Sequence, residues 1–314
     1  MNVLFRYDTS PALLDRLASL TADGLTVSIC SESDDERFAA LMSEAEVLWH
    51  VLKPVTGAVI ASAPNLKLIQ KIGVGVNTID LDAARARRIA VCNMPGTNSR
   101  AAAEHALLLM LAALRCLSVL DPATREHRGW KLGANIQDRL GEVAGRTVGL
   151  VGYGAIPRVL APILTAMGAR TLYVALTPKD DAAAEWRELP DLLAESDIVS
   201  LHVPLTPQTE MMIDARAIAR MKAGAILINT ARGGLVDQEA LAAALQSSHL
   251  RAAGLDVFTS EPVEADNPLL HLDNVVVSPH VAWLTQETIA RSLGLAVENC
   301  RRIVAGKQLL YQVV

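Results

Sequence analysis

Short apolar runs alternate with amphipathic stretches over the first hundred residues. One stretch, residues 11–20, carries leucines on one face at helical spacing and predicts a helix. The apolar runs around it predict strands at residues 2–7, 24–30, 46–51, 66–73 and 88–93. This alternation indicates a small α/β unit.

A second series of the same kind fills the rest of the chain. Residues 98–120 are rich in Ala and Leu and predict one long buried helix, with Asn98 or Ser99 as its N-cap. Further strands are predicted at 146–152, 169–176, 196–204, 225–231, 251–258 and 274–280. Helices are expected at 157–167, 214–221, 237–246 and about 285–305. Six strands with intervening helices describe a doubly wound sheet.

The composition narrows the class of protein. A chain of 314 residues is long for one core, so two domains are expected. The net charge of −5, with no basic stripe, argues against a nucleic-acid partner. The longest apolar run, 105–114, is about half a membrane span, and the first residues lack the pattern of a signal peptide. We therefore expect a cytoplasmic protein. The four cysteines are far apart, so no metal site is expected.

Residues 150–160, LVGYGAIPRVL, nearly match the glycine fingerprint of dinucleotide-binding loops. Gly152 allows the tight turn, and Gly154 lets the backbone approach a pyrophosphate. The amides of Ala155 and Ile156 are expected at a helix N-terminus, which attracts anions. Pro157 replaces the third glycine, but proline is tolerated in the first turn of a helix. An ordinary strand–helix turn is the alternative.

Ionisable side chains follow three of the later strands, at the edge where open α/β sheets bind ligands. Arg232 can clamp a carboxylate with its planar guanidinium. His280 with Glu261 or Asp256 would form the usual acid–base pair, because a carboxylate orients the imidazole. Hydride from a nicotinamide plus a proton from His280 would reduce a 2-oxo acid. Taken singly, each residue has a plain alternative: a surface arginine, a solvated turn or a core histidine.

Together these stretches resemble the D-isomer-specific 2-hydroxyacid dehydrogenase family over nearly the whole chain. The matching blocks are KIGVGVNTID (71–80), PGTNSRAAAEHALLLML (95–111), VGYGAI (151–156), HVPLTPQT (202–209), INTARGGLVD (228–237), GLDVFTSEP (254–262) and VSPHVA (277–282). The resemblance implies an α/β fold of two doubly wound parallel-sheet domains. A Rossmann cofactor domain, 99–282, would be inserted into a flavodoxin-like substrate domain made of 1–98 and 283–314.

The resemblance also implies roles for residues. Arg232 would bind the substrate carboxylate, His280 would act as acid–base, and Glu261 would pair with His280. The backbone of Val74, Gly75 and Val76 would meet the substrate carboxylate. Contacts to the cofactor would come from Val203, Thr230, Ala231 and Arg232, and Asp256 would hold the nicotinamide carboxamide. The helix from about residue 99 would pack a homodimer.

The chain departs from the family's pattern at several positions. Besides Pro157, Ala102 stands where relatives often carry Ser, Thr or Val. Ala175 replaces the aspartate that usually holds the adenine ribose, and Thr177 and Lys179 follow it. A hydroxyl and an ammonium suit a phosphate, so NADP(H) is favoured over NAD(H). Acceptance of both cofactors is the alternative.

Two tryptophans bear on the substrate. Trp49 ends a predicted strand and Trp283 follows His280 by three residues. They would wall a pocket for small polar acids, or they are simply core side chains. The stretches around them look like family members that reduce glyoxylate or hydroxypyruvate. The formate-oxidising branch carries glutamine in place of Glu261, which argues against formate. Phosphite oxidation and a dinucleotide-sensing binding protein of the same fold remain alternatives.

Overall fold

The computed structural model describes residues Met1–Val314, which form two compact units. The first unit comprises Met1–Asn98 and Thr285–Val314, and the second comprises Ser99–Leu284. The later boundary lies two residues beyond the position expected from the sequence. The reason is local: the amide of Leu284 donates to Val281 O, whereas Thr285 caps the following helix by accepting from Thr288 N.

The first unit contains a five-stranded parallel sheet in the order β2-β1-β3-β4-β5. This is the flavodoxin-like order of a doubly wound sheet. Its strands are β1 Asn2–Arg6, β2 Thr26–Cys30, β3 Val47–His50, β4 Leu68–Lys71 and β5 Ala90–Cys92. Its helices are α1 Pro11–Ser19, η1 Leu20–Asp23, α2 Asp35–Met42, α3 Gly57–Ala61, α4 Leu81–Ala86 and α11 Gln286–Val304.

Buried hydrogen bonds join the C-terminal segment to the first hundred residues. Asn299 Nδ2, on α11, donates to Gln70 Oε1 on β4 at 2.7 Å, and neither residue has exposed surface. Val91 N donates to Val314 O at the end of the chain. Because buried amides need partners, these contacts commit the last thirty residues to this unit.

The second unit contains a seven-stranded parallel sheet in the order β12-β11-β10-β9-β6-β7-β8. If the strands are numbered from β6 as the first, the order is that of the dinucleotide-binding fold, with one further strand, β12, at the edge. The strands are β6 Thr147–Val151, β7 Arg170–Val174, β8 Glu185–Trp186, β9 Ile198–Leu201, β10 Ala225–Asn229, β11 Leu250–Leu255 and β12 Val275–Val277. The sequence predicted six of these; β8 was missed because its two residues carry no apolar run.

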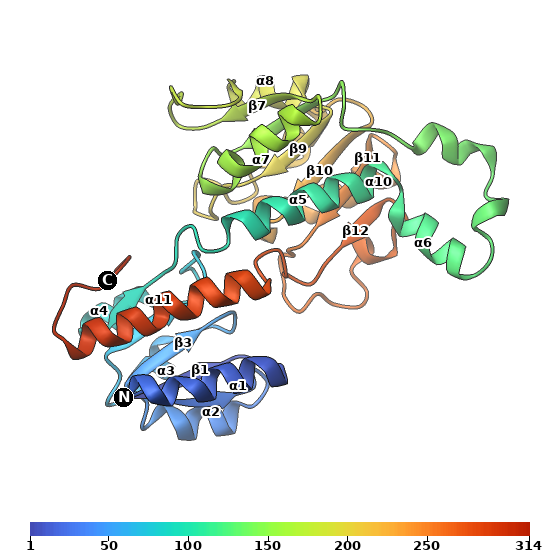
Figure 1. Ribbon diagram of the computed structural model, residues 1–314. Coiled ribbons are helices and arrows are strands. Elements are labelled where there is room, and N and C mark those ends of the chain that lie inside the picture. The colour runs from blue at the N-terminus through green and yellow to red at the C-terminus, as the bar shows by residue number, and fades with distance from the viewer. The chain divides into compact units, whose positions relative to one another are not determined.

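Helices cover both faces of this sheet, and each face has its own core (Figure 1). One face is packed by α5 Ser99–Leu114 and α7 Ala155–Ala166. The other face is packed by α8 Leu189–Glu195, α9 Ala215–Arg220 and α10 Gln238–Gln246. The remaining helical elements are α6 Leu117–Arg125, η2 Gly129–Lys131, η3 Ala134–Arg139, η4 Gly233–Leu235 and η5 Pro268–His271.

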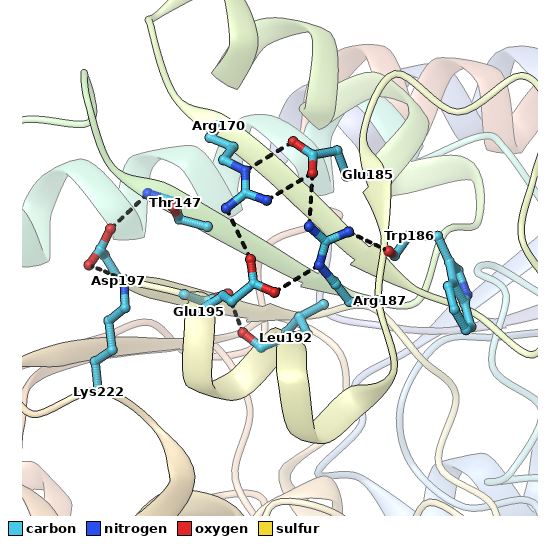
Figure 2. Close-up of polar contacts among 10 residues, drawn as sticks. Thr147, Arg170, Glu185, Trp186, Arg187, Leu192, Glu195, Asp197 and Lys222 are labelled. Carbon is cyan, nitrogen blue, oxygen red and sulfur yellow. Dashed lines mark hydrogen bonds and ion pairs between the residues drawn. The ribbon is translucent and has the colours of Figure 1, made fainter.

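A ring of four charged side chains anchors the short edge strand β8 (Figure 2). Arg170 donates to Glu185 and Glu195, and Arg187 donates to the same two carboxylates, all at 2.8–3.0 Å. The hydrogen bonds from Arg170, ahead of those from Arg187, lower the pKa of Glu185 to about 2. A closed ring holds β8 against β7 where an isolated surface pair would contribute little.

The prediction of one helix over 98–120 is wrong. The structure has two helices, α5 and α6, bent by 70° from one another. The break lies at Cys116, whose φ of 51° is left-handed. The carbonyl of Leu114 ends α5 by accepting from Gly141 N and from the Arg251 guanidinium. By length and apolar composition, no single helix qualifies as a membrane span; only this bent pair, taken together, meets that test.

Candidate active site

The glycine loop joins β6 to α7 in the geometry that a pyrophosphate requires. Gly152 has φ of +100°, and a Cβ there would lie 2.6 Å from His202 O. Only glycine therefore fits this turn. Gly154 is the N-cap of α7, and a Cβ there would meet nothing within 4 Å. The space in front of Gly154 is open, as an approaching ligand needs.

The first turn of α7 tolerates Pro157 for the reason expected from the sequence. The helix begins at Ala155, so Pro157 is its third residue, and the first intrahelical bond runs from Arg158 N to Gly154 O. An amide at position 157 would have no partner within the helix. The amides of Ala155 and Ile156 remain at the N-terminus, where the helix dipole favours an anion.

Two buried polar atoms without partners lie at neighbouring strand ends. Thr230 Oγ1 follows β10, and His202 Nδ1 follows β9 beside Val203. Burial lowers the pKa of His202 to about 4, so its ring is neutral near pH 7. Buried polar groups are normally hydrogen-bonded. Together with the open glycine cradle, these atoms fit a bound dinucleotide. Ala231 is half-buried next to Thr230.

His280 and Glu261 form a close pair across two loops. His280 Nδ1 lies 2.6 Å from Glu261 Oε2, and Glu261 Oε1 accepts from Phe258 N at 2.9 Å. Burial raises the pKa of Glu261, but the bonds from His280 and Phe258 and the charge of Arg232 outweigh it. The net pKa is lowered. Glu261 is therefore ionised near neutral pH and accepts a hydrogen bond from Nδ1–H of His280. The other ring nitrogen, Nε2, is left to face a substrate.

Arg232 lies between the glycine loop and the acid–base pair in the order of the strands. It follows β10, and its Nη1 donates to Ala231 O at 2.6 Å. The next residue, Gly233, is buried so closely that a Cβ would overlap the backbone of Phe258. This contact joins the Arg232 loop to the loop that carries Glu261. Burial lowers the pKa of Arg232, while the charge of Glu261 raises it. A guanidinium stays protonated under both influences.

Asp256 organises the loop that carries His280. Its carboxylate has no exposed surface and accepts from Val281 N and Ala282 N, both at 2.9 Å. Its backbone carbonyl accepts from His280 N at 2.8 Å. His280 itself has φ of 55°, which is unusual for a residue other than glycine. The contact of Asp256 with a nicotinamide carboxamide stays a prediction.

Comparisons with known proteins agree with this geometry. Residues 107–282 match the model of the D-isomer specific 2-hydroxyacid dehydrogenase, NAD binding domain. The chain belongs to the D-isomer-specific 2-hydroxyacid dehydrogenase family.

Named relatives support this assignment. The D-3-phosphoglycerate dehydrogenase of Mycobacterium bovis is 40% identical over 94% of this chain. The chain spans only 57% of that relative's length. A glyoxylate reductase of Korarchaeum cryptofilum is 41% identical over 78% of this chain and 75% of its own. Among solved structures, the TT0316 protein from Thermus thermophilus superposes with a TM-score of 0.89 at 37% identity, over the whole of both chains.

The turn after β7 is the segment where the sequence predicts the adenine ribose to bind, and this stays a prediction. We call residues 175–183 the adenosine turn. Leu176 is fully exposed, and Lys179 Nζ donates to Thr177 Oγ1 at 3.2 Å. Two tyrosines anchor the turn: Tyr173 Oη accepts from Lys179 N, and Tyr153 Oη accepts from Ala183 N. The structure therefore places Thr177 and Lys179 together at the surface.

Sequence reasoning missed an ion pair at the same turn. Arg158, in the first turn of α7, donates from Nη1 and Nη2 to the two carboxylate oxygens of Asp181, at 2.5 and 3.1 Å. The hydrogen bond from Arg158 is the main reason that the pKa of Asp181 is lowered. The sequence shows an arginine next to a proline and an acid far along the chain, with no signal that connects them.

The remaining predicted substrate residues lie in the first unit, apart from Trp283. Trp49 has no exposed surface and packs edge-on against Phe5, so it is a core side chain, the alternative that the sequence left open. The loop after β4 exposes Val74, followed by half-buried Gly75 and Val76, within the segment that was predicted to meet a carboxylate. Trp283, in the second unit, is half-buried in the turn after His280.

Proposed function

We propose that this chain is a nicotinamide-dependent reductase that interconverts small 2-oxo acids and D-2-hydroxy acids, with glyoxylate or hydroxypyruvate as its preferred oxo acid. The observation that carries the proposal is the 2.6 Å pair of His280 and Glu261 on loops next to Arg232, beside a dinucleotide cradle. We further propose that the second unit holds the cofactor.

Each residue then has one task in reduction. Arg232 binds the carboxylate of the oxo acid through its two-pronged guanidinium, and the backbone of Val74–Val76 supplies further donors. Protonated His280 donates the proton on Nε2 to the carbonyl oxygen of the substrate. Glu261 accepts a hydrogen bond from the other ring N–H, which orients the imidazole and stabilises its positive charge. In the oxidative direction His280 takes the hydroxyl proton back.

The cofactor supplies the hydride that the carbonyl carbon receives. Its pyrophosphate would lie on the amides of Ala155 and Ile156, in front of Gly154. Val203, Thr230 and Ala231 would line its nicotinamide half, where Thr230 Oγ1 lacks a partner. Asp256 would meet the carboxamide. These tasks need only backbone donors and short side chains, which this chain provides.

NADPH is the preferred cofactor in this proposal. Ala175 offers no carboxylate to the adenine ribose, whereas the hydroxyl of Thr177 and the ammonium of Lys179 lie together on the adenosine turn. An ammonium attracts a 2′-phosphate as a point charge. Use of NAD(H) is the alternative.

We also propose that the protein is a cytoplasmic homodimer. The segment 117–141 extends from the sheet as an arm in Figure 1. Trp130 on this arm is 83% exposed, and Leu117 is 48% exposed. Apolar side chains of this size in solvent indicate an interface, and a second copy of this chain would cover them. All four cysteines are free, as in reducing compartments.

Consumption of NADPH or NADH in the presence of a panel of acids tests the function. The panel holds glyoxylate, hydroxypyruvate, pyruvate and 3-phosphohydroxypyruvate; the last is included because of the M. bovis relative named a phosphoglycerate dehydrogenase. Phosphite with the oxidised cofactor tests the phosphite alternative. Turnover of glyoxylate or hydroxypyruvate at the highest kcat/KM supports the proposal. Tight cofactor binding without turnover of any acid would favour a dinucleotide sensor.

A further inference from the structure

We propose that His105 and Ser278 are positioning residues that hold the loop of His280 through Asp256, so that helix α5 sets the catalytic geometry. This inference rests on the proposed function, because it assumes that His280 transfers the proton. It assigns a task to two side chains for which the reaction itself has no use.

A continuous chain of hydrogen bonds connects α5 to the catalytic loop. His105 Nε2 lies 2.8 Å from Ser278 Oγ, and Ser278 Oγ donates to Asp256 Oδ1 at 2.6 Å. Asp256 then accepts from the amides of Val281 and Ala282, on the far side of His280. The loop is thus held on both sides of the catalytic residue. Its anchor lies 173 residues from Ser278 in sequence.

The packing of α5 brings His105 within hydrogen-bond distance of Ser278. The helix lies across β11 and β12, and Gly254 on β11 lets Leu109 approach so closely that a Cβ would lie 2.8 Å from Leu109 Cβ (Figure 1). His105 lies one turn before Leu109 on α5, at the carboxyl ends of these strands. Its side chain is 16% exposed, so the ring is largely fixed by its surroundings.

The donors and acceptors in this chain have one consistent arrangement. Because the hydroxyl of Ser278 donates to the carboxylate, its oxygen must accept from His105, so His105 carries a proton on Nε2. Asp256 has no exposed surface and keeps its charge only with such donors. Burial raises the pKa of Asp256, and the bonds from His105, Ser278 and the two amides lower it below its usual value.

Loss of the hydrogen bonds from His105 to Ser278 and from Ser278 to Asp256 should misplace His280 rather than unfold the second unit. Without Ser278 Oγ, Oδ1 of Asp256 keeps the amide of Val281 at 2.9 Å and a longer contact of 3.4 Å to His105 Nε2. His280 holds a left-handed backbone, which costs free energy and persists only while the surroundings impose it. A small relaxation of this loop moves Nε2 away from the substrate oxygen, and a misplacement of about 1 Å can cost about 100-fold in rate.

Two pairs of substitutions test the proposal with matched controls. At position 278, Ser278→Thr keeps the hydroxyl, whereas Ser278→Val has the same shape without it. In His105→Gln the side-chain amide nitrogen lies near the former site of Nε2. In His105→Asn it reaches only as far as the former site of Nδ1. Steady-state kinetics would give kcat, and calorimetry would give the Kd of the reduced cofactor for each variant.

We expect Ser278→Val and His105→Asn to lower kcat about 10-fold or more while the cofactor Kd changes little. Ser278→Thr and His105→Gln should keep most of the activity, and the double variant Ser278→Val/His105→Asn should be no worse than either single one, because both break one chain. The proposal would be overturned if Ser278→Val and His105→Asn kept the kcat of the wild type. It would also be overturned if His105→Gln and His105→Asn lost kcat to the same extent.

A measurement without substrate separates this inference from the proposed function. In nuclear magnetic resonance spectra of protein labelled with ¹⁵N-histidine, the Nδ1 proton of His280, bonded to Glu261, should shift in His105→Asn and return in His105→Gln. An unchanged His280 resonance in His105→Asn contradicts the positioning role even if the protein reduces no oxo acid. If the resonance shifts as expected but wild-type protein has no reductase activity, only the proposed function fails.

Discussion

Two ends of the seven-stranded sheet differ in how they hold their functional side chains. At the loops after β11 and β12, the candidate site residues have fixed partners: Glu261 for His280, and the amides of Val281 and Ala282 for Asp256. On the adenosine turn after β7, the polar side chains are exposed: Lys179 contacts Thr177, and Asp181 pairs with Arg158 on α7.

In the proposed function, the difference follows from what each end has to do. Proton transfer depends on the position of one atom, so the catalytic loops are tied to buried strands and tolerate little change. Recognition of a ribose phosphate depends on charge at the surface, where solvent screens each interaction. Substitutions at the catalytic end should therefore have large effects on rate, and those on the adenosine turn small effects on affinity.

The largest effect should come from removal of the acid–base. His280→Ala should lower kcat for reduction by about 10²–10⁴-fold, the usual contribution of a positioned acid–base group. The Kd of the reduced cofactor should change little, because the glycine loop lies on another strand. Stopped-flow or steady-state assays measure the rate, and calorimetry measures the affinity. Full turnover in this variant would assign the proton to another group.

The next effect concerns the carboxylate clamp. Arg232→Lys keeps the charge but replaces a planar two-pronged donor with a single ammonium. The loss of one charge-assisted hydrogen bond should lower kcat/KM for the oxo acid about 10-fold or more. Kinetics with a saturating cofactor check this value. A variant with the kcat/KM of the wild type would show that Arg232 does not bind the substrate.

A smaller and pH-dependent effect should follow from Glu261→Gln. The pKa of Glu261 is lowered, so the carboxylate is charged across the neutral range and favours the imidazolium of His280. Reduction needs that imidazolium. Without the negative charge the imidazolium loses the partner that stabilises it, so the alkaline limb of kcat against pH should move to lower pH. An alkaline limb at the wild-type position would mean that the pair does not act in catalysis.

The smallest effect is expected on the adenosine turn. Lys179→Ala should weaken NADPH binding about two- to fivefold, in the range of an exposed ion pair, and leave NADH binding nearly unchanged. Raising the salt concentration should reduce the difference between the two cofactors in the wild type. The comparison of Kd values by calorimetry checks both statements. A wild-type enzyme with a higher kcat/KM for NADH than for NADPH would contradict the proposed preference.

The contact of Glu261 with His280 could be predicted from the sequence because both residues come after apolar strands. Parallel strands bring their carboxyl ends to one edge, so Arg232, Glu261 and His280 were expected to meet there. The chain His105–Ser278–Asp256 could not be predicted in the same way. A histidine inside an apolar helix and a serine before Pro279 give no sign of a common partner until α5 is packed on β11.

The fold was predictable where periodicity is strong and failed where single contacts decide. The break after Leu114 depends on a carbonyl that Arg251 and Gly141 occupy, and neither residue is close in sequence. The hydrogen bond of Asn299 with Gln70 likewise joins distant segments and was not predicted. The family resemblance implied only that the two ends of the chain build one domain. Trp49 was ambiguous because alternation along a strand does not show whether its neighbours leave one face open.

Transfer of a label tests the central claim most directly. The protein would be incubated with glyoxylate or hydroxypyruvate and with NADPH that carries deuterium at the hydride-donating position. The account predicts a 2-hydroxy acid with deuterium on C2 in wild-type protein, and about 10²–10⁴-fold less of it per unit time in His280→Ala. Cofactor that stays reduced with every acid of the panel, or product whose C2 hydrogen comes from water, would contradict the account.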